Sequence, residues 1–340
     1  MWINDILEKK GKILALSPMA DMTDSAFCQV VRQIGGADVV FREMVSSEAI
    51  IRHNEKTLGM TDFVPAERPI VQQIFGADPQ TMAQAAAIVM EHASPEGIDI
   101  NMGCPVYKIT SNFNGAALMK DPDLACRIIR EMKAAIGNTP LSVKIRLGWD
   151  DPDTFSSFIP KIEQAGAQLI TIHGRTKKQG YSGVSDIMRI AQAKAIATVP
   201  LLANGDIHDP RQVQEALDVT NADGVLIARG ALGNPWFFQQ YISGEYIISL
   251  EERVRIIKQH LQLHMAQYGE RGLVTFRKHL SWYLKTNKVG LDIPGIKELR
   301  GKIVRADSLE QTHAILDELV EMGDQSKIFD FAPKSLSQTN

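Results

Sequence analysis

Short runs of apolar, mostly β-branched residues recur along the first two thirds of the chain, and Gly, Pro or Asp bounds each run. Such runs are typical of strands that are buried on both faces. Eight of them are found, at residues 13–19, 39–44, 70–75, 98–103, 141–147, 169–173, 201–204 and 224–228. They start on average about 30 residues apart, which is the length of a strand, a loop and a helix.

The stretches between these runs have helical patterns. Residues 79–92 are rich in Ala and Met, residues 123–135 place Leu124, Ile128 and Met132 at helical spacing, and residues 210–217 follow a turn. Eight alternating strand and helix units predict an α/β protein with a closed (β/α)₈ barrel, the TIM barrel. An open doubly wound sheet is the alternative, but the Gly-x-Gly-x-x-Gly fingerprint usual in such sheets does not occur in the chain.

After about residue 245 the pattern predicts helices alone. Residues 251–268 carry one apolar stripe, residues 273–288 bury Phe276, Leu280 and Leu284, and Ser308 to Gln311 form a capping box that opens a last helix. We therefore predict a barrel domain over 1–244, a small helical domain over 245–333, and a frayed tail over 334–340.

The composition is that of a globular protein, with 340 residues of which 44% are hydrophobic and 23% charged. This balance excludes disordered, collagen-like and small disulfide-rich proteins. Apolar runs stay well below the roughly 18 residues of a membrane span, and the first residues lack the order of a signal peptide, so we expect a cytoplasmic protein. Three cysteines without a Cys-x-x-Cys pair disfavour disulfides and cysteine zinc sites. Cys28 and Cys126 fall mid-helix and are expected to be small buried side chains.

The formal net charge of −3 conceals a segregation of charge. Residues 251–305 contain 12 Lys and Arg against 5 Asp and Glu, whereas residues 306–340 contain 2 against 7. In the helix predicted over 273–288, Arg277 and Lys285 stand on one stripe opposite the apolar one. Such a basic block is typical of a surface that contacts a phosphate backbone, and a solvated helix face is the alternative.

The ends of the predicted strands are polar, and in a barrel of this kind the carboxyl ends of the strands form the active site. Lys144 and His173 end neighbouring strands, where they could supply positive charge beside a ring that becomes anionic on reduction, as a flavin does. The segments Asn204-Gly205-Asp206 and Ala228-Arg229-Gly230 end the last two strands, where barrels often hold a phosphate. Taken singly, His173 could instead be a satisfied core residue, and Asn-Gly-Asp a turn.

Cys104 follows the fourth strand on a Gly-Cys-Pro turn, inside the longest interval of the barrel. Its thiol could act as a proton donor or, beside a cation, as a nucleophile, and both roles are open at this stage. His260 and His264 stand one helical turn apart without an acidic partner of the His-Glu-x-x-His kind, which favours a structural role and predicts no metal site.

Six segments at the strand ends together resemble the tRNA-dihydrouridine synthases, a family of flavoenzymes that reduce uridines in tRNA. They are Ser17-Pro18-Met19-Ala20 with Thr23-Asp24, residues 71–76, Asp99-Ile100-Asn101-Met102-Gly103-Cys104-Pro105 with Lys108, residues 143–149, residues 172–176, and residues 204–207. The resemblance covers about residues 10–325. Arg277-Lys278-His279 with residues 281–284 resembles the helical domain of a bacterial branch of that family.

The resemblance implies bound FMN, NADPH as reductant and tRNA as partner, in a monomeric enzyme without a metal or a membrane contact. FMN N5 would deliver hydride to C6 of a uracil extruded from the tRNA, and Cys104 would protonate C5. The implied cofactor residues are Pro18, Met19, Ala20 and Gln73 at the flavin ring, Lys144 and His173 at its pyrimidine edge, and Asn204, Gly205, Asp206, Ala228 and Arg229 at the phosphate. The implied substrate residues are Asn101, Lys108 and Arg146 near the uracil, and Arg277, Lys278 and Lys285 on the helical domain.

The chain departs from the family pattern at two places. Ala228-Arg229 stands where the family has Gly-Arg, and residues 109–115 differ from its usual Lys- and Gly-rich loop. Two other functions remain alternatives: an FMN oxidoreductase acting on a free pyrimidine, and an RNA-binding protein with a catalytically silent barrel. The modified uridine and the choice between NADPH and NADH also stay open.

Overall fold

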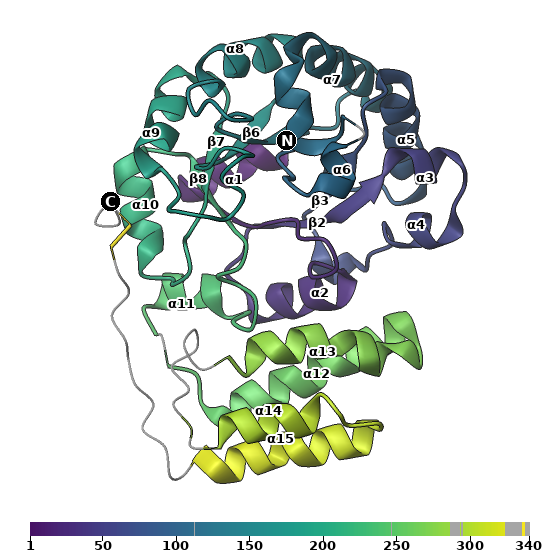
Figure 1. Ribbon diagram of the computed structural model, residues 1–340, viewed down its shortest axis with the longest axis vertical. Helices are drawn as coiled ribbons and strands as arrows, with labels where there is room; N and C mark the ends of the chain where they lie inside the picture. Colours follow the sequence, from purple (N-terminus) through teal and green to yellow (C-terminus); the bar gives the residue numbers. More distant parts are fainter. Residues whose placement is uncertain (112, 246, 286–292, 294, 324–334, 337–340) are drawn as a thin grey trace.

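The computed structural model describes the whole chain except residues 112, 246, 286–292, 294, 324–334 and 337–340. Eight parallel strands form a closed barrel in chain order (Figure 1). The strands are β1 Ile13–Leu16, β2 Val39–Ser46, β3 Ile70–Phe75, β4 Gly97–Met102, β5 Leu141–Arg146, β6 Leu169–His173, β7 Leu201–Asn204 and β8 Gly224–Ile227. The barrel closes between β1 and β8, where Ile13 lies opposite Gly224. The predicted (β/α)₈ barrel is therefore confirmed.

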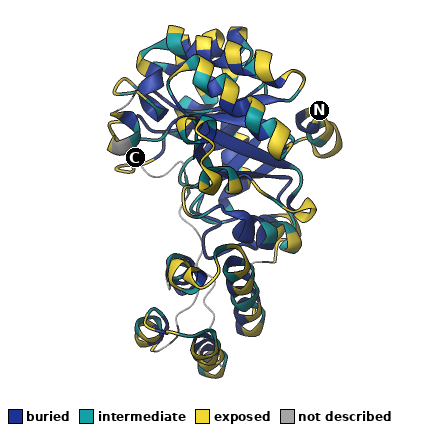
Figure 2. Ribbon diagram, turned by 90° about the vertical axis from the view of Figure 1, so that its right-hand side faces the viewer, coloured by how far each residue is buried: buried dark blue, intermediate teal, exposed yellow. Residues whose placement is uncertain are grey.

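Helices cover the outside of the barrel and form a separate layer beyond it (Figures 1 and 2). The barrel carries α1 Trp2–Lys10, α2 Ser25–Ile34, α3 Ser47–Ile51, α4 Glu55–Gly59, α5 Pro79–His92, α6 Tyr107–Thr110, α7 Pro122–Ile136, α8 Phe155–Ala165, α9 Ile187–Ile196, α10 Gln212–Thr220 and α11 Phe237–Ser243, with 3₁₀ turns η1 Pro65–Glu67 and η2 Gly115–Lys120. The helix predicted over 210–217 begins later, at Gln212, because the side chain of Gln212 accepts hydrogen bonds from the backbone N–H groups of His208 and Asp209 and holds them in a turn.

Aspartates begin four of the barrel helices. Asp24, Asp78, Asp121 and Asp186 each accept a hydrogen bond from a backbone N–H in the first turn of α2, α5, α7 and α9 respectively. This N-cap satisfies a backbone donor that the helix itself leaves without a partner. The loops after the strands are thereby given defined ends, which helps to position the residues that the loops carry.

Helix α1 closes the bottom of the barrel. Trp2 and Ile3 of α1 pack with inward-facing strand residues such as Val39 and Leu202, and the rings of Trp2 and Phe41 meet edge to face at 6.4 Å. A larger apolar cluster fills the layer between the strands and the outer helices. Because side chains fill the amino-terminal end, the carboxyl end of the barrel is the face where a ligand can enter.

The remaining helices form a unit that packs beneath α2 (Figure 1). They are α12 Leu250–Tyr268, α13 Arg271–Tyr283, α14 Ile296–Ile303 and α15 Leu309–Gly323. Their apolar cluster is distinct from that of the barrel and includes Val30 of α2, whereas Phe237 and Phe238 of α11 belong to the barrel cluster. The domain boundary near residue 245 stays a prediction. In the described part of the chain, none of the helices is long and apolar enough to cross a membrane.

Two boundaries in the helical unit can be compared with the prediction. Helix α13 ends at Tyr283 with Leu284 as its C-cap, so the helix predicted to reach residue 288 is shorter and Lys285 lies beyond its end. Ser308 accepts a hydrogen bond from the N–H of Gln311, which confirms the predicted start of the last helix. The Gln311 side chain accepts from the N–H of Asp307, one residue before the position expected for a capping box.

In the predicted tail, Ser335 and Leu336 donate hydrogen bonds to the carboxylate of Glu215. Residues 334 and 337–340 lie outside the described residues.

Candidate active site

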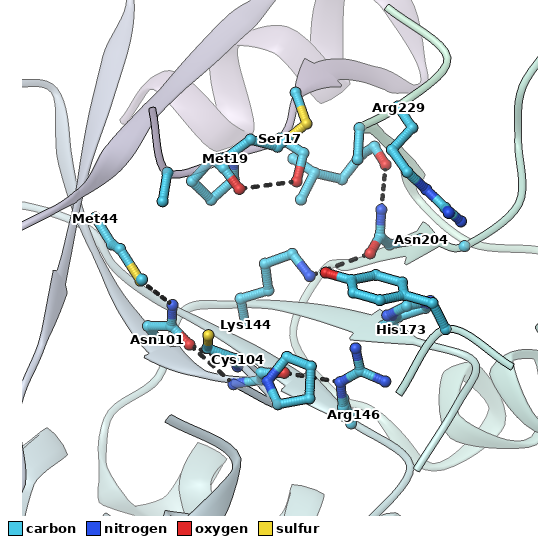
Figure 3. A pocket seen from close by; sticks show the side chains of 18 of the residues that line it. Ser17, Met19, Met44, Asn101, Cys104, Lys144, Arg146, His173, Asn204 and Arg229 are labelled. Carbon is cyan, nitrogen blue, oxygen red and sulfur yellow. Dashed lines mark hydrogen bonds between the residues drawn. The ribbon is translucent and has the colours of Figure 1, made fainter. Parts of the chain in front are cut away.

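A cavity of about 310 Å³ lies at the carboxyl ends of the strands (Figure 3). This volume is at the lower end of the range for small-molecule sites. The predicted catalytic Cys104 and thirteen of the predicted cofactor and substrate residues line it: Pro18, Met19, Ala20, Gln73, Asn101, Lys144, Arg146, His173, Asn204, Gly205, Asp206, Ala228 and Arg229. The structure therefore brings together residues that the sequence places on seven separate strand ends.

Asn101, at the end of β4, shapes the turn that carries Cys104. Its side-chain oxygen accepts hydrogen bonds from the backbone N–H groups of Gly103, at 3.1 Å, and Cys104, at 2.9 Å. Its amide nitrogen donates to Gln73 Oε1 at 3.0 Å and contacts Met44 Sδ at the same distance. Asn101 thus positions the cysteine turn, while its direct contact with substrate stays a prediction.

Gln73 is held in turn by a buried carboxyl group. Gln73 Nε2 donates to Asp99 Oδ2 at 2.6 Å, and Ser142 Oγ donates to Asp99 Oδ1 at 2.6 Å. Burial raises the pKa of Asp99 to about 6, although both hydrogen bonds and the charge of Lys144 oppose this rise. The chain of contacts from Ser142 to the cysteine turn orients the Gln73 amide at the cavity wall.

Cys104 is partly buried at the cavity wall, opposite the side where Met19 lies (Figure 3). Burial raises the pKa of its thiol, and this effect outweighs the charges of Arg146 and Lys144, which favour the thiolate. The thiol therefore keeps its proton at neutral pH. Of the two roles open from the sequence, this electrostatic environment favours the proton donor over the nucleophile.

Lys144 reaches toward the cavity centre (Figure 3), where its Nζ donates to Asn204 Oδ1 at 3.1 Å. Burial, together with the charge of Arg146, lowers the pKa of Lys144 to about 8. His173 ends the neighbouring strand, and burial with four nearby cations lowers its pKa well below the usual value, so the ring is neutral. Because Lys144 donates to an amide and not to a carboxylate, its charge stays available to an anionic ligand.

An ion-pair network borders the end where a phosphate is predicted. Arg175 donates to both carboxylate oxygens of Asp206, at 2.9 and 2.5 Å, and Arg229 donates to the same group at 3.2 Å. Burial would raise the pKa of Asp206, but the Arg175 hydrogen bonds and the Ser185 N–H hold it below the usual value. The carboxylate is thus engaged by protein, so the backbone of Asp206 and not its side chain is suited to an anion.

Gly205 lies between Asn204 and Asp206 with φ of 129°, a conformation that favours glycine. A Cβ atom there would collide with Ser185 Oγ and would lie 2.8 Å from His173 Cδ2. The turn can therefore pack this closely against Ser185 and His173 only because the side chain is absent.

Arg146 lines the cavity but donates mainly to backbone. Its Nε donates to the carbonyl of Gly103 at 2.7 Å, and its Nη1 to those of Thr176 and Gly180, both at 2.9 Å. Burial lowers the pKa of Arg146 to about 10, which leaves it charged. Arg146 thereby connects the cysteine turn to the loop after β6, and its predicted contact with substrate remains untested.

Several residues at or beside the cavity had no role in the sequence prediction, among them Arg175, Tyr181 and Met44. Arg175 had none because its contact with Asp206 becomes apparent only once β6 and β7 are side by side. Tyr181 lines the cavity with its ring 5.7 Å from the Arg146 guanidinium and 5.1 Å from that of Arg229. Met44 also lines it. Tyr181 lies in a loop without any pattern that could have identified it.

The other predicted substrate residues are not among the described lining of the cavity. Lys108 belongs to α6, and its side chain is outside the described part of the structure. Arg277 of α13 donates to the carbonyl of Ala306 at 3.2 Å, Lys278 follows it on the same helix, and Lys285 Nζ lies 5.0 Å from the centre of the Trp282 ring. These three basic residues remain predicted RNA contacts.

Comparison with known proteins shows to which family the chain belongs. The family model described as dihydrouridine synthase (Dus) matches residues 14–321. A tRNA-dihydrouridine synthase B of Pseudomonas syringae pv. tomato is 37% identical over 91% of this chain and 92% of its own length. A protein of the same name from Pasteurella multocida is 39% identical over 79% of this chain and 83% of its own length.

Among solved structures, morphinone reductase superposes with a TM-score of 0.52 and 11% identity, over 68% of this chain and 86% of its own. That likeness concerns the barrel fold alone. The family model spans both the barrel with its polar mouth and the helical unit as far as residue 321. The resemblance noted at the strand ends is therefore confirmed, and the chain belongs to the dihydrouridine synthase family.

Proposed function

We propose that this protein reduces uridines in cytoplasmic tRNA to 5,6-dihydrouridine, with FMN bound in the cavity, NADPH as the reductant and Cys104 as the proton donor to C5. The observation that carries the proposal is the cavity itself, in which a protonated thiol, a cationic lysine and a glycine turn converge. The relatives named tRNA-dihydrouridine synthase support the substrate.

The residues around the cavity fit the chemistry of FMN. Pro18, Met19, Ala20 and Gln73 would hold the ring, and Lys144 with His173 would meet its pyrimidine edge, where positive charge favours the reduced, anionic form. Asn204, Gly205, Asp206, Ala228 and Arg229 would hold the phosphate through backbone N–H groups and the Arg229 guanidinium. When bound and reduced, FMN supplies a hydride to C6 of the uracil.

Cys104 would complete the reduction by moving one proton. Its Sγ carries a hydrogen at neutral pH because burial raises the pKa of the thiol. Transfer of that proton to C5 leaves a thiolate, whose charge the nearby Arg146 and Lys144 stabilise. The hydrogen bonds from Asn101 to the backbone of Gly103 and Cys104 hold the thiol in place before the transfer.

The target base must leave its stack to reach this cavity, because the ring carbons of a stacked uracil are not accessible. Residues 251–305, with their excess of basic residues, lie on the helical unit and would contact tRNA phosphates through Arg277, Lys278 and Lys285. Unstacking costs a few kcal/mol, which these contacts and stacking on the flavin would offset.

The proposal is tested with tRNA isolated from a strain that lacks the gene. The purified protein, which should be yellow, is incubated with this tRNA and NADPH, and dihydrouridine is mapped by nucleoside mass spectrometry. We expect dihydrouridine at defined positions with the wild-type protein and with Cys126→Ala, a cysteine outside the cavity lining, and formation slowed by about 10²–10⁴-fold with Cys104→Ala. A protein that reduces a free pyrimidine and leaves tRNA unchanged would disprove the proposed substrate, and a colourless protein that takes up no FMN would disprove the cofactor.

A further inference from the structure

Four buried side chains meet where the helical unit packs against the barrel. Asp24 caps α2, His260 and His264 come from α12, and His279 comes from α13. Each offers one potential ligand atom, and these atoms all lie within 4.8 Å of one another. Each side chain belongs to a residue that is at most 2% exposed.

Each of the four also has one buried polar atom without a hydrogen-bond partner among the described residues. These atoms are Asp24 Oδ2, His260 Nε2, His264 Nδ1 and His279 Nε2. Each such atom costs free energy because its desolvation is not repaid, and here four of them gather in one cluster. A shared partner for all four atoms would remove this cost.

In two of the histidines, the other ring nitrogen has a hydrogen-bonding partner outside the cluster. His264 Nε2 lies 2.8 Å from Thr275 Oγ1, whose own hydrogen is directed at the helix carbonyls of Arg271 and Gly272. When Thr275 accepts from Nε2–H, Nδ1 of a neutral ring keeps a lone pair. That Nδ1 lies 3.1 Å from Asp24 Oδ2. Two lone pairs at this distance repel each other unless a proton or a metal cation lies between them.

His260 is arranged in the same way. Its Nδ1 lies 3.0 Å from the hydroxyl of Tyr283, which leaves Nε2 directed into the cluster. An outer hydrogen bond that fixes the tautomer and the ring orientation is the arrangement found around metal-ligating histidines. Phe276 packs against this ring at 4.8 Å and Phe27 at 5.4 Å, so apolar groups surround the cluster.

Burial disfavours charge on two of the rings. It lowers the pKa of His260 well below its usual value and that of His279 to about 3, so both rings are neutral. Burial would raise the pKa of Asp24, but His264, whose Nδ1 lies 3.1 Å from Asp24 Oδ2, holds it below its usual range, so the carboxylate is ionised. Tyr268 lies against the His264 ring at 4.4 Å and adds no charge.

We propose that Asp24, His260, His264 and His279 bind one zinc ion that joins the helical unit to the barrel. Three imidazoles and one carboxylate suit Zn²⁺, whereas Mg²⁺ and Ca²⁺ prefer oxygen ligands throughout. Tetrahedral Zn²⁺ with bonds of about 2.0–2.1 Å holds its ligand atoms about 3.3 Å apart, so small side-chain movements would close the observed spacing. A complete set of four protein ligands leaves no open position, which assigns the ion a structural role.

The ion would act on the geometry between the two parts of the molecule. Asp24 belongs to the loop after β1, whose earlier residues Met19 and Ala20 line the cavity, and the histidines belong to the helices that carry the basic residues. Zinc would thus hold the basic surface of the helical unit at a fixed orientation to the mouth. Unlike the proposed chemistry of the mouth, this inference depends only on the cluster.

The first test is the metal content of the full-length protein, produced without an affinity tag and purified without chelator. We expect about one zinc per chain by plasma mass spectrometry, and X-ray absorption that shows only nitrogen and oxygen ligands at about 2.0 Å. Removal of zinc with a chelator should lower the melting temperature by about 5 °C or more, and added ZnCl₂ should restore it.

Variants then assign the site. Asp24→Asn keeps the N-cap, because asparagine caps helices as well as aspartate does, but removes the anionic ligand. Both Asp24→Asn and His279→Asn should lose zinc, whereas the matched control His53→Asn, at an exposed position, should retain it. If either variant fails to fold, the chelation and reloading of the wild-type protein decides the question.

Four outcomes would overturn the proposal. The first is wild-type protein that holds less than about a tenth of an equivalent of zinc after incubation with ZnCl₂ and shows no change in melting temperature. The second is zinc retained by both variants. The third is stoichiometric binding of another metal in preference to zinc. The fourth is nitrogen NMR that shows a metal-free His264 imidazolium donating to Asp24.

Discussion

The barrel mouth and the Asp24–His cluster are both groups of polar side chains inside the protein. They differ in whether hydrogen bonds and ion pairs within the protein satisfy the buried polar atoms. At the mouth, Arg146 donates to three backbone carbonyls and Arg175 forms a two-pronged ion pair with Asp206. In the cluster, four buried atoms face one another without a partner among the described residues. A site whose polar atoms are satisfied by the protein can remain open and exchange its ligand. A closed site whose polar atoms lack partners is stabilised by an ion that stays bound.

The largest effect is expected at Cys104 of the barrel mouth. Replacing it with alanine should lower the rate of dihydrouridine formation by about 10²–10⁴-fold, the usual contribution of a positioned general acid. Single-turnover assays with reduced enzyme measure this rate. Flavin content and melting temperature should stay near those of the wild type, and Cys126→Ala should leave all three unchanged. A wild-type rate in Cys104→Ala would assign the proton to another group.

A substitution that creates a cavity in the core of the helical unit should lower the stability of that unit and leave the barrel mouth intact. Leu280 is 1% exposed in the apolar cluster of that unit, so Leu280→Ala should cost about 2–5 kcal/mol of unfolding free energy. Calorimetry should show earlier melting, together with weaker tRNA binding, while flavin absorbance persists. Val274→Ala, at a 56% exposed position of the same helix, is the matched control. Simultaneous loss of flavin would show that the two regions unfold as one.

Lys144 should make flavin binding depend on pH. Its pKa is lowered to about 8, and an anionic ligand binds the charged form, so the complex holds the proton more tightly than the unliganded protein does. Affinity for FMN should therefore fall as pH rises through about 8. Lys144→Met should bind FMN about 10- to 100-fold more weakly, the value of a charge-assisted hydrogen bond.

Fluorescence titration of FMN between about pH 6 and pH 10 measures this effect. The variant should lack the step near pH 8 that the wild-type protein shows. A step of the same size in Lys144→Met would mean that another group titrates.

The smallest effect is expected at Tyr181, whose ring lies near the guanidinium groups of Arg146 and Arg229. Loss of these cation–π contacts in Tyr181→Leu should cost about 0.5–1 kcal/mol, or roughly two- to fivefold in FMN affinity. The same titration detects the change, with Tyr107→Leu, at an 80% exposed position, as control. A much larger loss would indicate that Tyr181 contacts the ligand itself.

The sequence was sufficient for the barrel and for most of the residues at its mouth. Eight buried strands at regular spacing leave few arrangements besides a closed parallel barrel, and parallel strands bring their carboxyl ends to one rim. Lys144, Asn204 and Arg229 could therefore be placed in one site although they lie far apart along the chain. The limits of the helices were less predictable, as the early end of α13 at Tyr283 shows, because local contacts and not periodicity decide where a helix stops.

Tertiary structure alone decided which polar groups meet. His260 and His264 could be recognised one helical turn apart, but Asp24 and His279 join them through the packing of α2 against α12 and α13, a contact that no local pattern encodes. The same holds for Arg175 with Asp206 and for Tyr181. Periodicity reports which face of an element is buried, whereas the partner across that face depends on how separate elements pack.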